Sequence, residues 1–148
     1  MARTSLPDPR SGLVIGYSYL WENEFRAGRD EGSKDRPSVV VIAIRTEDGD
    51  IVTTVAPITH RQPADPLDGI ELPSMIKRLL GLDDARSWLI CAELNRFVWP
   101  GPDLRPISRQ HPGQFVYGTL PRPFMLRVFQ RLQKLRKRRR PAVVVRSA

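Results

Sequence analysis

Hydrophobic positions fall in short runs separated by turn residues along most of the chain. Residues 12–21 form a β-branched and aromatic run, and residues 38–44 form an almost continuous apolar run rich in Val and Ile. Runs this short and this β-branched are typical of strands, and the second would be buried on both faces. An Asp-Gly turn at 47–50 connects it to a further run at 51–58, so the two runs predict an antiparallel hairpin.

The hydrophobic patterns in the rest of the chain are weaker. Residues 70–72 and 87–94 predict strands, with a short helix at 73–80 between them that starts at Pro73 and is capped by Gly81. Residues 115–118 predict a last strand. After Pro121 the apolar residues fall on one helical stripe, and these residues are Met125, Val128, Phe129, Leu132 and Leu135. Strands and helices do not alternate, which favours a mainly β (α+β) fold, a small antiparallel barrel with an amphipathic C-terminal helix.

The remaining segments predict little regular structure. Residues 22–35 are charged and contain two glycines, which is typical of a flexible loop, and residues 95–113 carry no regular pattern. We expect residues 1–11 to be a disordered leader, residues 137–148 to be a basic tail, and the chain beyond Pro141 to fray. The single domain then covers residues 12–136.

Charge is unevenly distributed along the chain, and this distribution indicates more about possible partners than the overall composition does. From Leu104 to Ala148 the chain carries 12 of its 24 Lys and Arg residues and none of its 16 Asp and Glu residues. Such a segment attracts polyanions such as RNA, although a basic tail can equally well serve only to solvate the protein. The single cysteine, Cys91, suits a reducing compartment, and the apolar patterns predict neither a membrane span nor a signal peptide. The sequence therefore predicts a soluble, cytoplasmic protein.

Candidate chemistry gathers at the ends of the predicted hairpin. Arg36 precedes the first run and Thr59 ends the second, so a rigid scaffold could hold both together. Arg presents a planar fork of donors that matches a phosphate, and a Thr hydroxyl can orient one. Equally, Arg36 could pair with Asp35 or Glu31 on the surface, and Thr59 could bond to the backbone.

Other side chains are weaker candidates. A histidine can act as a general base near neutral pH, and the neighbouring His60 can share a site with Thr59 only if the strand has ended there. Trp21 and Trp99 could stack on unpaired bases, or could be core residues. No His and Cys cluster has metal-ligand spacing, so we predict neither a metal nor a cofactor.

Two motifs resemble the MazF/PemK (Kid-like) type II toxin family. The first is Lys34-Asp35-Arg36-Pro37 followed by an apolar strand, and the second is Val55-Ala56-Pro57-Ile58-Thr59 after a hairpin. The resemblance covers roughly residues 12–94. It implies an SH3-like barrel that acts as a metal-independent endoribonuclease on single-stranded RNA, forms a homodimer and binds a cognate antitoxin. Arg36 and Thr59 would match the family's catalytic Arg and Thr, and Lys34 would help to bind phosphate, with His60, Trp21 and Trp99 as further substrate contacts.

The chain departs from this family in two places. One branch uses an Arg and an Asp on either side of the strand cysteine as acid and base, and here these positions are Ile90 and Ala92. The segment 95–106 around Trp99-Pro100-Gly101-Pro102 is longer and less basic than in typical members, so it is either a lid or a sign of drift from catalysis. The alternative is therefore a non-catalytic barrel that binds RNA or, like the gyrase-binding CcdB relatives, a protein target.

Overall fold

The central hairpin is formed by the two longest strands. The computed structural model describes residues 6–32, 34–138 and 141–146. Strand β2 (Arg36–Arg45) pairs antiparallel with β3 (Ile51–Thr59), as predicted. Gly49 closes the turn between them with φ +88°, a conformation that a residue with a Cβ rarely adopts. The apolar runs and the Asp-Gly turn thus build the centre of the fold.

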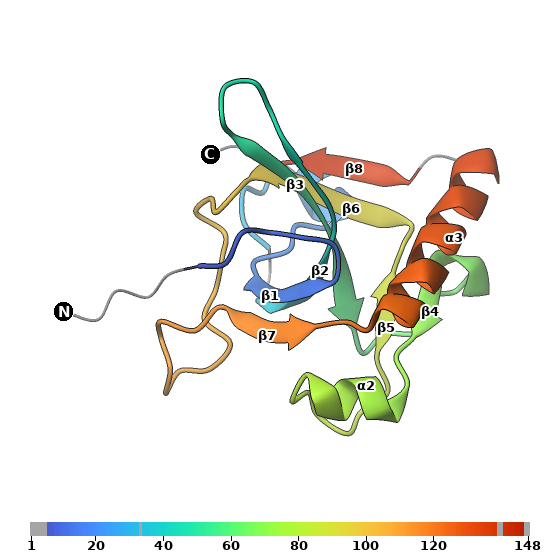
Figure 1. Cartoon of the computed structure of the whole chain (residues 1–148). Helices are drawn as coiled ribbons and strands as arrows, with labels where there is room; N and C mark the ends of the chain where they lie inside the picture. The colour runs from blue at the N-terminus through green and yellow to red at the C-terminus, as the bar shows by residue number, and fades with distance from the viewer. Residues whose placement is uncertain (1–5, 33, 139–140, 147–148) are drawn as a thin grey trace.

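The other strands extend this hairpin on both sides. Within the described residues, eight strands form one curved sheet around which the helices lie (Figure 1). On one side β1 pairs with β2 and with β7, and on the other β3 pairs with β5 and with β6. Strand β4 joins β5, and β8 joins β6. The additional bounds are β1 (Leu13–Tyr17), β4 (Gly69–Glu71), β5 (Trp88–Ile90), β6 (Glu93–Val98), β7 (Val116–Thr119) and β8 (Ala142–Val145).

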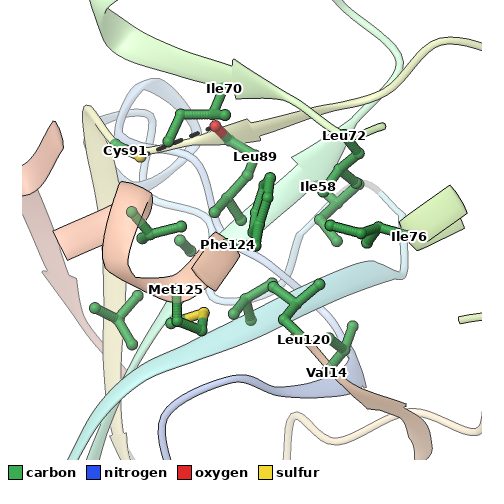
Figure 2. Close-up of a cluster of buried hydrophobic side chains, with 14 of the residues drawn as sticks. Val14, Ile58, Ile70, Leu72, Ile76, Leu89, Cys91, Leu120, Phe124 and Met125 are labelled. Atoms are coloured by element: carbon green, nitrogen blue, oxygen red, sulfur yellow. Dashed lines mark hydrogen bonds between the residues drawn. The ribbon is translucent and has the colours of Figure 1, made fainter. Parts of the chain in front are cut away.

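Two clusters of buried side chains fill this fold. The larger contains Val14, Ile58 and Leu89 from the strands, together with Phe124 and Met125 from α3 (Arg122–Arg138), as Figure 2 shows. The smaller, which we call the aromatic cluster, packs Tyr17, Tyr19 and Phe97 among aliphatic side chains. The Tyr17 and Phe97 rings stack with 4.9 Å between their centroids. The predicted mainly antiparallel, barrel-like α+β fold with an amphipathic C-terminal helix is therefore confirmed.

Three predicted segments can be compared with the structure. The loop at 22–35 begins with a short helix, α1 (Glu22–Arg26), where the Trp21 N–H donates to the Glu24 carboxylate at 3.1 Å. The single strand predicted at 87–94 is two strands, β5 and β6, because the chain breaks at Cys91–Ala92 and continues along another part of β3. The short helix is confirmed as α2 (Ser74–Leu79), and a 3₁₀ turn, η1 (Pro66–Asp68), lies in the loop before β4.

The chain ends also differ from expectation. The prediction that the chain frays beyond Pro141 is wrong, because Ala142–Val145 form β8 in parallel with β6, and Arg146 is buried. An apolar Ala-Val-Val-Val segment beside an unpaired sheet edge explains this order. Residues 1–5, 139–140 and 147–148 of the predicted leader and tail lie outside the described residues. At the end of the leader Pro9 is buried, and the Ser11 hydroxyl donates to the Val41 carbonyl at 2.7 Å.

The outer face of the sheet far from Arg36 is aliphatic. We call it the aliphatic face, and its exposed members are Ile42, Ile44, Val98, Val143 and Val145. One row of paired residues crosses the sheet here and contains Ile42, Thr54, Arg96 and Val145. The other members of the aliphatic face lie in the adjacent rows. A groove of about 940 Å³ between this face and α3 includes Phe129 and Leu132. None of the described helices is long and apolar enough to cross a membrane.

Candidate functional site

Arg36 and Thr59 meet where the central hairpin opens. Strand β2 pairs with β3 as far as Ser38 and Pro57. Beyond this point Arg36 pairs with Tyr17 of β1, while Thr59 turns away to pair with Trp88 of β5. The two strands diverge here, so the space between them is not filled by a ladder of hydrogen bonds. Two pockets lie at this fork, and Lys34, Arg36 and Thr59 line both of them.

Arg36 is a buried cation at this fork. The residue is only 9% exposed, its Nε atom makes no hydrogen bond, and no ion pair joins it to a carboxylate of the described chain. Its guanidinium carbon lies 5.0 Å from the centre of the Trp21 ring, a cation–π contact that fixes its position. Burial lowers the pKa of Arg36, against the raising effect of Glu24. Removing an unpaired cation from water is costly, and an anion that bound beside it would offset this cost.

The first pocket, which we call the His60 pocket, has a volume of about 320 Å³. His60 and Asp83 face each other in it, with His60 Nε2 2.9 Å from Asp83 Oδ2. The buried Lys77 ammonium lies 3.3 Å from the other carboxylate oxygen of Asp83. Burial works to raise the pKa of Asp83, but the hydrogen bonds from His60 and Lys77 outweigh it and lower the pKa, so Asp83 stays ionised.

The second pocket, which we call the Trp21 pocket, has a volume of about 670 Å³. Ile90 and Ala92, the two positions that lack an acid–base pair, line it. Glu93, the next residue along the chain, also lines this pocket. Its carboxylate accepts a hydrogen bond from the Glu22 N–H at 2.8 Å. Burial raises the pKa of Glu93, and this effect exceeds the lowering effect of that hydrogen bond. A titratable carboxylate therefore stands beside the apolar pair.

The structure gathers most of the predicted site residues. Lys34, Arg36, Thr59 and His60 line the His60 pocket, and Trp21 lines the adjoining one. The Thr59 hydroxyl oxygen accepts from the Arg61 N–H at 3.2 Å, so the strand has ended there, as a shared site for Thr59 and His60 requires. The proposed roles of these residues toward RNA stay predictions.

Trp99 lies outside the candidate site. It lines neither pocket and packs on the aromatic cluster, with its ring centroid 6.1 Å from that of Phe97. The loop that follows lies along β1, where the Ser18 N–H donates to the Asp103 carbonyl and the Arg105 N–H donates to the Gly16 carbonyl. A Cβ on Gly16 would lie 2.2 Å from the Arg105 carbonyl oxygen. This loop is packed against the barrel, and only Ile107 of it reaches the His60 pocket.

Two acidic residues of the site were not among the sequence candidates. Asp83 lies in a charged turn after α2, and Glu93 falls near the end of an apolar segment that predicts one strand. The signal that could have found Glu93 is its position as a lone charge among the apolar residues 88–92 and Leu94. Within the parts of the chain that the structure describes, no group of three or more His, Cys, Asp or Glu side chains could hold a metal ion.

Comparisons with known proteins leave the family open. No protein-family model matches the chain, and no curated protein matches it either. The resemblance to MazF/PemK toxins therefore rests on the two motifs and their order along the chain.

Proposed function

We propose that this chain is an endoribonuclease that cuts single-stranded RNA without a metal ion, as a growth-inhibiting toxin in the cytoplasm. The observation that carries the proposal is the Arg36 guanidinium, 9% exposed, lacking a carboxylate partner in the described chain and shared by two pockets. Cleavage through the 2′-hydroxyl builds negative charge on the non-bridging oxygens of one phosphate. A preorganised arginine stabilises that charge in the transition state.

The surroundings of Arg36 support a nucleic-acid substrate. Lys34 and Arg61 add positive charge to the Trp21 pocket, and Thr59 lines both pockets together with Arg36. Each pocket has the volume of a small-ligand site, so the two could receive the nucleotides on either side of one phosphate. In this arrangement Arg36 and Lys34 hold the phosphate, Thr59 orients it, and Trp21 holds Arg36 in place.

The proposal includes the partners that the toxin resemblance implies, a second copy of the chain and a cognate antitoxin. The aliphatic face and its groove of about 940 Å³ have a composition suited to such contacts. A second candidate function is the same barrel without chemistry, binding RNA or, as CcdB relatives do, a protein target. The apolar side chains of Ile90 and Ala92 in the Trp21 pocket favour it.

The test is incubation of the purified protein with a long single-stranded RNA in EDTA. We expect discrete cuts that leave 2′,3′-cyclic phosphate ends, and a loss of about 100-fold or more in rate for Arg36→Ala. Arg45→Ala is the matched control, because Arg45 is an exposed arginine at the other end of β2. An Arg36→Ala protein that cuts at the wild-type rate would exclude the proposed site. Intact RNA with tight, salt-sensitive binding would favour the non-catalytic barrel.

A further inference from the structure

The two pockets at Arg36 differ in the titratable group that each contributes. The His60 pocket holds an imidazole, and the Trp21 pocket holds the Glu93 carboxylate. Since both pockets share Arg36, Lys34 and Thr59, a phosphate on Arg36 would have one of these groups on each side. Cleavage of RNA through its 2′-hydroxyl needs this arrangement, because the attacking and leaving oxygens lie on opposite sides of phosphorus.

His60 is arranged as a proton donor. Its Nε2 faces the Asp83 carboxylate at 2.9 and 3.1 Å, and its Nδ1 makes no hydrogen bond to another described residue. The Asp83 carboxylate holds the imidazole through Nε2, while the hydrogen bonds from His60 and Lys77 keep Asp83 ionised. The other charged or titratable side chains that line this pocket are Lys34, Asp35, Arg36 and Tyr117.

Glu93 is arranged as a proton acceptor. The Glu22 N–H donates to Oε1 and fixes the carboxylate, and no ion pair joins Glu93 to a cation of the described chain. Half-burial raises its pKa, which brings its titration closer to neutrality and makes the carboxylate a stronger base. The other charged side chains facing this pocket are Glu24 of α1, Lys34, Arg36, Arg61 and Asp68.

We propose that Glu93 is the general base and His60 the general acid of the cleavage, acting from the two sides of Arg36. This inference rests on the proposed function and assigns the proton transfers of the same site. Glu93 takes the proton of the 2′-hydroxyl as O2′ forms a bond to phosphorus. The bond between phosphorus and O5′ breaks, and O5′ takes a proton from His60. The products are a 2′,3′-cyclic phosphate and a 5′-hydroxyl, so no oxidant, reductant or water is consumed.

The variants for the test are Glu93→Gln and His60→Ala. Glutamine keeps an oxygen that can accept from the Glu22 N–H, and His60 is exposed, so both proteins should fold, which melting curves can verify. The matched controls are Glu47→Gln in the β2–β3 turn and His111→Ala, the other histidine of the chain. The substrate is an RNA that wild-type protein cuts, made also with sulfur in place of O5′ at the cut. A thiolate leaves without needing a proton from the enzyme.

We expect each variant to cut the ordinary RNA about 10²- to 10⁴-fold more slowly than wild type, while the controls keep the wild-type rate. His60→Ala should regain most of its rate on the sulfur-containing RNA, and Glu93→Gln should stay slow. Glu93→Gln should also lose the rise of rate with pH that ionisation of the Glu93 carboxylate gives the wild-type protein.

The outcomes separate this inference from the proposed function. If wild type cuts RNA and depends on Arg36, but both variants keep the wild-type rate, the acid–base assignment is overturned and the nuclease remains. The assignment is also overturned if His60→Ala is equally slow on both substrates. If wild type leaves RNA intact, the proposed function fails, and this inference fails with it.

Discussion

Two arginines are buried within the described part of this basic chain, and their surroundings are opposite. Arg146 is 7% exposed and donates to the Ser18 carbonyl at 2.6 Å, to Asn95 and to the Asp30 carbonyl, and it lies 2.9 Å from the Asp103 carboxylate. Arg36 is almost as deeply buried, but it has the Trp21 ring and no carboxylate partner of the described chain. Two arginines of similar burial therefore differ in their hydrogen bonds: those of Arg146 are satisfied within the fold, whereas Nε of Arg36, which we propose binds a phosphate, has no partner.

Removing Arg146 should have the largest effect on stability. Arg146→Ala would leave Asp103 buried without its cation, and burial already raises the pKa of that carboxyl against the lowering effect of Arg146. We expect the free energy of unfolding to fall by about 3–5 kcal/mol, measured by urea denaturation at neutral pH. In a matched control, Arg146→Ala combined with Asp103→Ala should recover part of the loss. A change below about 1 kcal/mol would show that β8 does not depend on this arginine.

Removing Arg36 should change the free energy of unfolding less than removing Arg146, and in the opposite direction. Arg36→Met replaces a buried and unpaired cation by an apolar side chain of similar length, at the expense of the cation–π contact with Trp21. The same urea titration should show a free energy of unfolding that is unchanged or up to about 2 kcal/mol higher. A loss of more than about 1 kcal/mol would instead place Arg36 in the same structural class as Arg146.

The smallest effect on stability is expected for Arg86, an exposed arginine that makes two short hydrogen bonds. Arg86 makes two hydrogen bonds to Glu71, at 2.8 and 2.7 Å, and lies over the Trp88 ring. Both charges stay in water, so Arg86→Ala should leave the urea midpoint unchanged within error. A loss comparable to that of Arg146→Ala would mean that hydrogen-bond geometry outweighs burial in this protein.

Sequence patterns predict local structure here better than they predict pairing. The β2–β3 hairpin and α3 follow from runs that are continuous in the chain. The sequence pattern does not predict strand β8, because its four apolar residues follow an Arg-rich segment and their partner, β6, begins at Glu93, far back along the chain. Its pairing is parallel and non-local, so no turn signal announces it.

In the candidate site, too, the sequence predicts the residues placed by local structure and not those placed by non-local pairing. Arg36 begins β2 and Thr59 ends β3, so the hairpin that the sequence predicts places both residues at the same end of the sheet. Glu93 joins them only because the chain breaks after β5, and the apolar letters of residues 87–94 do not reveal that break. Asp83 reaches His60 from a turn that no periodicity places.

Strand β8 also has a consequence for the handling of the protein. It pairs only with β6 among the described strands and exposes Val143 and Val145, so two molecules could associate along this edge. The basic residues at the end of α3, Arg136 to Arg138, make such an approach repulsive. That repulsion reaches about 10 Å at 0.1 M salt and about 3 Å at 1 M. The high salt that strips RNA from a basic protein would therefore also promote its self-association, and purification should remove the RNA by other means.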